Sequence, residues 1–235
     1  MRNQLSYNFF SFLIFFCLIP FYSIVYGQGK NVVLPVKLLK TNTNKPLVFY
    51  ITGDGGWNDF SNQFISGLNK NGYSIIGLDS KKYFWIKKTP NQFADDVKPL
   101  ISQYLREWNK KEVIIIGYSF GADVSAFLPS NMNQAVTDKI KAMILLSPGY
   151  STSYEVKLMD MLNSGGNSNG EKYKVYPELF RANFPVTCIF GSEDDSDFKL
   201  GLKENKNIHK IIIKGNHHYD DDIPLVLKTV LNAID

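Results

Sequence analysis

Four consecutive apolar residues at positions 113–116 lead directly into Gly117-Tyr118-Ser119-Phe120-Gly121, followed by Ala122, Asp123 and Val124. This pattern is typical of a buried strand that enters a G-x-S-x-G turn and continues as a helix. The turn is too tight for a Cβ at either flank, which explains the two glycines. An ordinary strand–turn–helix crossover is the alternative. The flanking strand and helix patterns favour a turn that presents Ser119 as a nucleophile.

From Pro46 onward, apolar runs alternate with helical patterns, as in parallel α/β sheets. We predict strands over residues 47–51, 73–78, 113–116, 140–146, 186–190 and 208–213. Helical spacing covers residues 60–68 and 93–108, and Pro99 predicts a kink or a two-part helix there. Asp222 is expected to cap a final helix, and residues 165–170 to form a flexible loop tip. The sequence predicts a mostly parallel, doubly wound sheet in a three-layer αβα sandwich with a minimal lid.

The N-terminal residues predict that the protein is exported, and we do not expect them to belong to the fold. The apolar stretch from Phe9 to Ile19 is too short to span a bilayer comfortably and long enough for a signal-peptide core. We expect a signal peptide over residues 1–27, either cleaved or retained as an anchor, and a single domain over residues 28–235. Removing residues 1–27 takes one base, Arg2, from 26 Lys and Arg residues and none of the 22 acids, which leaves +3. This small, dispersed excess does not indicate a nucleic-acid partner.

Acids and histidines follow two later strands, in the order that a serine triad needs in an α/β-hydrolase. A serine hydroxyl needs a base to take its proton and an acid to orient that base. We predict Ser119 as nucleophile and His217 as base, because it lies nearest the strand end; His218 is the alternative. Asp194 is the predicted acid. Asp195 is its first alternative, and Glu193 is a more distant one.

An oxyanion hole needs two backbone N–H donors, and we predict the amides of Phe120 and Asp54. Asp54 lies in the glycine loop at residues 53–57, which lacks the Lys-Ser/Thr of a phosphate-binding P-loop. A metal-dependent reaction is the other alternative, because acids cluster around Asp194, His217 and residues 220–222. Their spacing matches neither an EF-hand nor an H-E-x-x-H zinc site. We therefore predict no metal and no cofactor.

Several motifs lie between Pro46 and the C-terminus: Gly53-Asp54-Gly55-Gly56-Trp57, Asp79-Ser80 with Tyr83-Phe84-Trp85, Thr89-Pro90, the serine turn with Ala122-Asp123-Val124, and Gly215-Asn216-His217-His218-Tyr219-Asp220. Together they resemble the bacterial VirJ/AcvB family of exported virulence-associated proteins over this range. The resemblance implies a periplasmic α/β-hydrolase. It also implies a substrate at the membrane surface: aminoacylated phosphatidylglycerol such as the lysyl form, cleaved at its aminoacyl ester.

Such a substrate would suit aromatic and acidic residues that follow strand ends, where ligands bind in open parallel sheets. Asp54 or Asp79 would receive the cationic aminoacyl group. The aromatic residues at 83–85 would meet acyl or glycerol surface, or else pack under the sheet edge. The predicted substrate-binding residues are Gly55, Trp57, Asp79, Tyr83 and Trp85.

Two other functions stay open at this point. The chain could be an interaction protein, with secretion-system components as partners, that keeps the hydrolase fold as a scaffold. It could also be a generic esterase or thioesterase.

Overall fold

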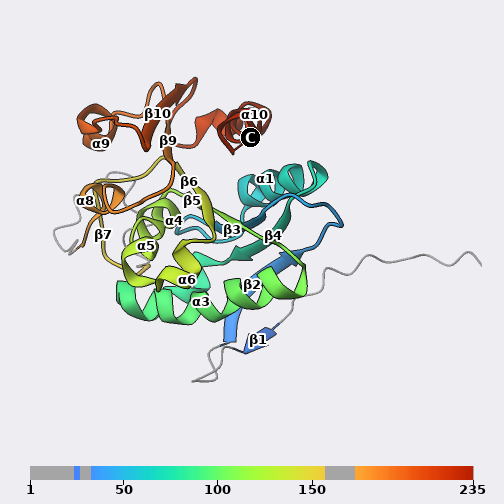
Figure 1. Cartoon of the computed structure of the whole chain (residues 1–235). Helices are drawn as coiled ribbons and strands as arrows, with labels where there is room; N and C mark the ends of the chain where they lie inside the picture. Colours follow the sequence, from blue (N-terminus) through green and yellow to red (C-terminus); the bar gives the residue numbers. More distant parts are fainter. Residues whose placement is uncertain (1–23, 27–32, 157–172, 235) are drawn as a thin grey trace, which may run out of the picture.

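The computed structural model describes residues 24–26, 33–156 and 173–234 (Figure 1). Most of the expected signal peptide and the expected loop tip at residues 165–170 lie outside these ranges. Within the described part, no helix is both long enough and apolar enough to cross a bilayer. Residues 24–26, inside the expected signal peptide, form the short strand β1.

One eight-stranded sheet runs through the molecule in the order β1-β2-β4-β3-β5-β6-β9-β10. Strand β2 is antiparallel to both of its neighbours, and the remaining pairs are parallel. The strands are β1 (Ile24–Tyr26), β2 (Val33–Leu39), β3 (Leu47–Ile51), β4 (Ser74–Leu78), β5 (Val113–Tyr118), β6 (Ile140–Leu146), β9 (Val186–Gly191) and β10 (Ile208–Ile213). The six predicted strands are confirmed. Strand β2 was not predicted, and Pro35 within it weakens the strand pattern.

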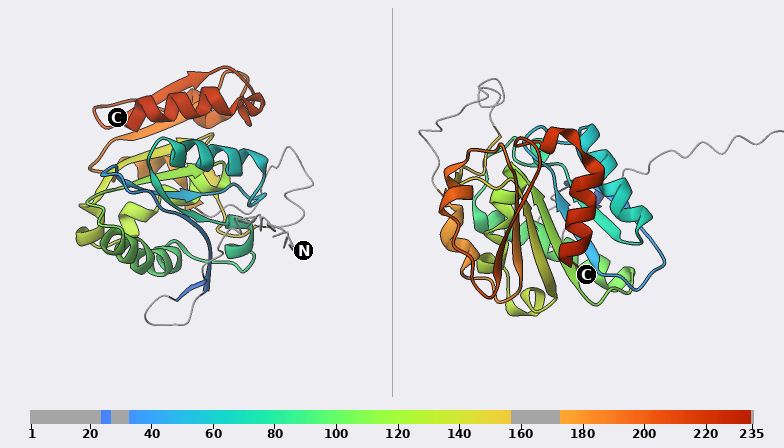
Figure 2. Two further views of the ribbon diagram at one scale, coloured as in Figure 1. Left: turned by 90° about the vertical axis from the view of Figure 1, so that its right-hand side faces the viewer. Right: turned by 90° about the horizontal axis from the view of Figure 1, so that it is seen from above.

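Helices cover both faces of the sheet, so the predicted three-layer architecture is confirmed (Figures 1 and 2). Helices α1 and α10 pack on one face, while α3, α4, α5 and α8 pack on the other. The helices are α1 (Asp59–Lys70), α2 (Ser80–Tyr83), α3 (Pro90–Glu107), α4 (Phe120–Ser125), α5 (Leu128–Asn131), α6 (Gln134–Thr137), α8 (Val175–Leu179), α9 (Asp197–Gly201) and α10 (Ile223–Ile234). A 3₁₀ turn, η1, spans Tyr219–Asp221, and β7 (Ser151–Thr152) pairs with β8 (Tyr173–Lys174) in a small second sheet.

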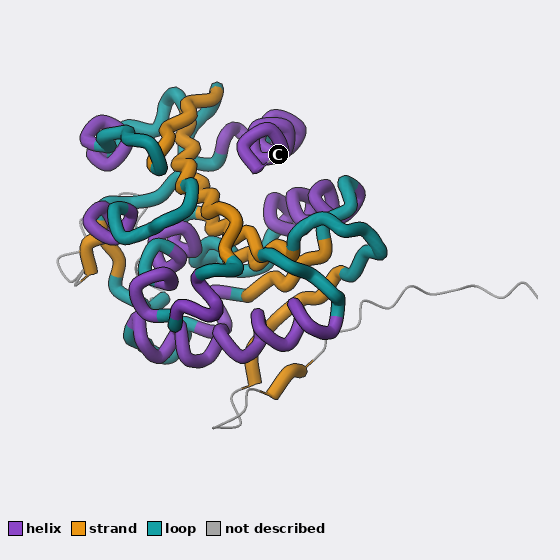
Figure 3. The backbone as a smooth tube through the Cα atoms, in the orientation of Figure 1, coloured by secondary structure: helices purple, strands orange, loops and turns teal. Residues whose placement is uncertain are grey.

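The apolar run in β5 reflects burial on both faces of the sheet. Val113 and Ile115 belong to the core under α3, whereas Ile114 and Ile116 belong to the core under α1 and α10. All four side chains are fully buried. A central parallel strand therefore needs apolar residues at every position rather than at alternate ones. The tube in Figure 3 shows this central layer of strands with helices on either side.

Local signals in the sequence set the helix ends. Thr89 and Gln92 form a reciprocal capping box at the start of α3. The Asp222 carboxylate accepts a hydrogen bond from the amide of Leu225, as predicted for the start of α10. Helix α3 is one element from Pro90 to Glu107, so the two-part alternative at Pro99 is wrong. The long apolar stripe of α3, packed against the sheet, holds the helix together around this residue.

The direction of the strand order reverses between β3 and β5. The chain leaves β3 through α1 to reach β4 on one side, then returns through α3 to β5 on the other side of β3. Ligands of open α/β sheets bind at the carboxyl ends of strands where the strand order reverses in this way. The loop at residues 52–58 and the Ser119 turn both begin at this point.

Candidate active site

Ser119 occupies a strained turn between β5 and α4. Its φ is 51° and its ψ is −120°, a backbone conformation that non-glycine residues rarely adopt. Such a conformation costs on the order of 1–3 kcal/mol and persists only where its surroundings hold it. Here the Ser119 amide donates to the carbonyl of Leu146 at 2.8 Å, and the Ser119 carbonyl accepts from Ala122 and Asp123. The neighbouring strand and the first turn of α4 thus fix the serine.

The two glycines of the turn are required by close backbone contacts, as the sequence predicted. A Cβ at Gly117 would lie 2.4 Å from the carbonyl oxygen of Gly121. A Cβ at Gly121 would lie 2.3 Å from the carbonyl oxygen of Ile51, at the end of β3. Both obstacles are backbone atoms that cannot rotate away. The turn therefore packs directly against the end of β3, where the glycine loop at residues 53–57 begins.

The structure brings His217 and Asp194 to Ser119. His217 Nε2 lies 3.0 Å from Ser119 Oγ, and His217 Nδ1 lies 3.3 Å from Asp194 Oδ2. If the imidazole carries its proton on Nδ1, it donates to the carboxylate and leaves Nε2 free to accept the serine proton. This is the geometry that base activation of a serine hydroxyl requires.

Asp194 is nearly buried, with 6% of its side chain exposed. Burial by itself raises the pKa of this carboxyl, but the hydrogen bond and charge of His217 oppose it. The Ser196 amide and the Lys199 ammonium add to that opposition, and the pKa is lowered overall. Lys199 is itself buried and donates to the carbonyls of Gly191 and Ser192. Asp194 is therefore held as a carboxylate facing the imidazole.

The neighbouring candidates point elsewhere. His218 Nδ1 contacts the hydroxyl of Tyr118, and its ring is roughly perpendicular to that of His217. Asp195 and Glu193 are exposed, whereas Asp194 between them is buried. In the ranges that the structure describes, no three His, Cys, Asp or Glu side chains gather as a metal site would need. Of the alternatives left open by the sequence, the structure places only His217 and Asp194 against the serine.

The loop that carries His217 is locked by contacts that the sequence did not reveal. Tyr219 is fully buried, and its hydroxyl donates to the carbonyl of Ile189 at 2.8 Å. Ser147 Oγ lies 2.9 Å from the carbonyl of His217 and 2.8 Å from the Tyr219 hydroxyl. A Cβ at Gly191 would lie 2.1 Å from the carbonyl oxygen of Asn216, so the acid loop and the histidine loop touch there. In the sequence, the one indication of these contacts was that Tyr219 belongs to the histidine motif.

The two amides predicted for an oxyanion hole come from the Ser119 turn and from the loop after β3. Phe120 begins α4 directly after Ser119, and Asp54 follows Gly53 in the loop after β3. Neither amide donates a hydrogen bond to another group in the described part of the chain. The Asp54 carboxylate accepts a hydrogen bond from the amide of Gly55 at 2.9 Å. The acid is thus engaged with its own loop, and its backbone N–H stays available.

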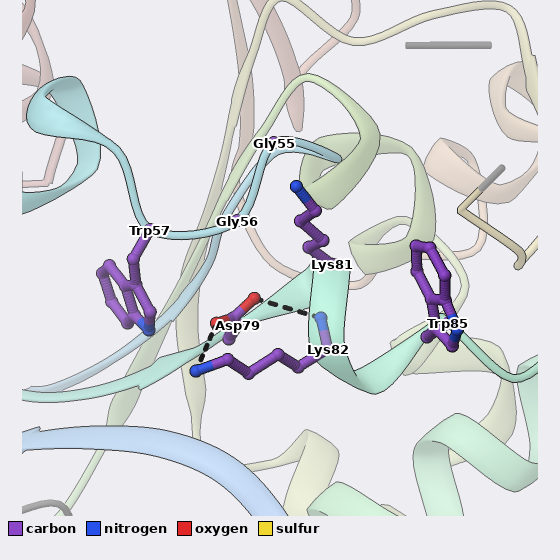
Figure 4. A pocket seen from close by; sticks show the side chains of 7 residues that line it. All are labelled: Gly55, Gly56, Trp57, Asp79, Lys81, Lys82 and Trp85. Atoms are coloured by element: carbon purple, nitrogen blue, oxygen red, sulfur yellow. Dashed lines mark hydrogen bonds and ion pairs between the residues drawn. The ribbon is translucent and has the colours of Figure 1, made fainter. Parts of the chain in front are cut away.

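A pocket of about 600 Å³ opens beside this loop (Figure 4). It is lined by Gly55, Gly56, Trp57, Asp79, Lys81, Lys82 and Trp85. Four of the five predicted substrate-binding residues therefore share one pocket. Tyr83 is the exception and a correction: its ring is buried against Phe84 and Phe93. Its hydroxyl donates to Asp96 at 2.6 Å, so Tyr83 belongs to the core.

Solved structures with the same fold include several esterases and hydrolases. Est1E from Butyrivibrio proteoclasticus matches with a TM-score of 0.64 and 19% identity, over 88% of this chain and 96% of that one. The esterase Pf2001 from Pyrococcus furiosus matches with a TM-score of 0.61 and 17% identity, over 90% and 91%. A putative dienelactone hydrolase from Klebsiella pneumoniae matches with a TM-score of 0.64 and 14% identity, over 88% and 94%. These likenesses establish the fold and confirm the predicted α/β-hydrolase class.

At the level of sequence, one family model matches. It is described as "Bacterial virulence protein (VirJ)" and covers residues 45–235, which is well over half of the chain. No curated protein sequence matches the chain.

Proposed function

The chain belongs to the VirJ family of bacterial virulence proteins, and from this premise we propose that it is a serine hydrolase of carboxylic esters. The observation that carries the proposal is the alignment of Ser119, His217 and Asp194 within hydrogen-bonding reach of one another. The fold that it shares with esterases supports the same reading.

In the proposed reaction, Ser119 Oγ attacks the ester carbonyl while His217 Nε2 takes the hydroxyl proton. Negative charge develops on the carbonyl oxygen and is met by the amides of Asp54 and Phe120. His217 then passes its proton to the alcohol as the carbon–oxygen ester bond breaks, which leaves an acyl group on Ser119. Water, deprotonated by His217, attacks this acyl group; the bond to Ser119 Oγ breaks, His217 returns its proton to Oγ, and the acid is released. Asp194 keeps the imidazole oriented and stabilises its charged form throughout.

The proposed substrate is the aminoacyl ester of an aminoacylated phosphatidylglycerol, such as the lysyl form, presented at the periplasmic membrane surface. The family resemblance supports it, and so does the pocket with two indoles beside the oxyanion loop. Its indole surfaces suit glycerol and acyl carbon, and its ionic groups suit a charged headgroup.

The experiment measures release of free amino acid from lysyl-phosphatidylglycerol vesicles by the purified protein. We expect release that stops in Ser119→Ala, with unchanged circular dichroism and melting temperature in that variant. Chemically intact ester after incubation with the native protein would reject this substrate. A panel of simple esters and thioesters then distinguishes a lipid-specific enzyme from a generic esterase, which would cleave the simple substrates and leave the lipid intact.

The rival function is an interaction protein of a secretion assembly that uses the fold as a scaffold. It predicts no turnover on any ester and no reaction of Ser119 with an active-site probe. Turnover that depends on Ser119 would exclude a purely structural role.

A further inference from the structure

The pocket beside the oxyanion loop carries a surplus of positive charge. Lys81 and Lys82 both line it and are exposed, and Asp79 is its single acid. Lys81 forms no ion pair or hydrogen bond with any residue that the structure describes. Figure 4 shows its side chain directed toward Gly55, with Trp57 and Trp85 on opposite sides of the two lysines. The pocket thus presents ammonium groups between two aromatic walls.

Asp79 does not offer its charge to a ligand. The residue is only 3% exposed, and its Oδ1 accepts a hydrogen bond from the Lys82 amide at 3.1 Å. Its Oδ2 lies 3.5 Å from Lys82 Nζ. Gly56 packs against it so closely that a Cβ there would lie 2.7 Å from Oδ1. The expectation that Asp79 receives a cationic aminoacyl group is therefore corrected: the carboxylate caps helix α2 and is paired with Lys82 of that helix.

We propose that this pocket binds a phosphate group carried by the alcohol part of the ester, with Lys81 and Lys82 as its ligands. The link to hydrolysis rests on the proposed function, whereas phosphate binding itself does not. Gly55 and Gly56 line the pocket and directly follow Asp54, whose amide is assigned to the oxyanion. We infer that an ester carbonyl at that amide directs a phosphate, a few bonds further along the alcohol, into the pocket that these glycines share with the lysines.

Charge sets the orientation of an aminoacylated phospholipid in this site. Its phosphate is anionic and lies on the alcohol side, and its aminoacyl end is cationic. The pocket holds two lysines and one acid, and this excess of positive charge attracts the first and repels the second. The phosphatidylglycerol moiety therefore lies over the pocket, and the aminoacyl end points away from it. The same chemistry would accept a soluble phosphate ester, so lipid and soluble ligands are tested separately.

Binding is tested first without turnover, in the Ser119→Ala protein. The protein has three tryptophans, and two of them, Trp57 and Trp85, line the pocket. Titration with sn-glycerol 3-phosphate should shift the indole N–H signals of these two in NMR spectra and leave that of Trp108 in place. The shifts should weaken as salt is added, because exposed charges are screened. Glycerol is the uncharged control.

Variants then locate the ligands. Lys81→Gln or Lys82→Gln should weaken binding about 5-fold each, as expected for one exposed charge contact, and the double variant roughly 20-fold. Lys81→Arg, which keeps the positive charge, should bind the phosphate about as tightly as the native side chain. Lys70→Gln is the matched control, because Lys70 is exposed at the end of α1 that lies away from the site. Absence of phosphate-dependent shifts, or equal shifts in the double variant, would overturn the site.

Kinetics connect the pocket to the reaction. We compare kcat/KM for an aminoacyl ester of glycerol phosphate with that for the same ester of glycerol. The ratio should fall about 20-fold in the double lysine variant, mainly through KM, and stay constant in Lys70→Gln. Vesicles of phosphatidylglycerol that compete more strongly than glycerol phosphate would identify the lipid as the source. An unchanged ratio would reject the substrate role of the pocket. If the native protein hydrolysed neither ester, that result would instead reject the proposed function.

Discussion

The two adjacent histidines provide a matched pair of variants. In the structure His217 contacts Ser119 and Asp194, whereas His218 contacts Tyr118. His217→Ala removes the base, and general acid–base catalysis with the coupled triad is worth about 10⁴-fold or more. That factor corresponds to roughly 5 kcal/mol of transition-state stabilisation. His218→Ala should keep turnover within about tenfold, the scale of a group that does not touch the reacting atoms.

Stability distinguishes a catalytic effect from damage to the fold. His217→Ala removes the hydrogen bonds to Ser119 and to the buried Asp194, and His218→Ala removes the contact with the buried Tyr118; each variant should lose on the order of 1–2 kcal/mol of unfolding free energy. Urea unfolding measures that loss, and initial rates on a chromogenic short-chain ester measure turnover. Similar stability with an activity difference of a thousandfold or more supports the assignment. Equal activity in the two variants, or a larger loss in His218→Ala, would exclude His217 as the base.

Three further substitutions test the supports of the site. Gly121→Ala should destabilise the fold by several kcal/mol, because its Cβ meets the Ile51 carbonyl at 2.3 Å; a melting temperature near that of the native protein would contradict this. The pKa of Asp194 is lowered in the folded protein, so its carboxylate stabilises the fold above the ordinary Asp pKa of about 4 and less as the pH falls below it. At pH 7, the Asp194→Asn variant should therefore unfold at a lower urea concentration than the native protein. Acidification should reduce its unfolding free energy by less than it reduces that of the native protein. The variant should also lose most turnover. Tyr219→Phe removes the hydroxyl bonded to the Ile189 carbonyl and should cost about 1–2 kcal/mol, with a fall in kcat that calorimetry and initial rates would measure.

Strands and the serine turn were predictable because their causes are local. Central strands are buried on both faces, which leaves an uninterrupted apolar run such as residues 113–116. The glycines at 117 and 121 are required by contacts within the turn or with the adjacent strand β3. Chain order and strand ends then place the acid and histidine loops at one edge of the sheet.

Choices between neighbours depend on contacts distant in sequence, which the sequence does not display. The position of His217 nearest the strand end favoured it over His218, but the hydrogen bonds of Tyr219 to the Ile189 carbonyl and to Ser147, which hold that loop, were not foreseen. Residues 219–221 all adopt positive φ values, which Tyr and Asp rarely do, and no turn signal announces this. Tyr83 and Trp85 are two residues apart, yet one is buried and the other is 56% exposed. Contacts with Phe84, Phe93 and Asp96 bury Tyr83 and distinguish it from Trp85.

The central claim is that Ser119 is an activated nucleophile. The most direct measurement is covalent labelling by a fluorophosphonate probe, followed by mass spectrometry of the peptide that contains residues 117–121. We expect rapid labelling at Ser119, its loss in Ser119→Ala and strong slowing in His217→Ala, with His218→Ala labelled at close to the native rate. A folded native protein that stays unlabelled, or equal labelling of the Ser119→Ala protein, would contradict this claim.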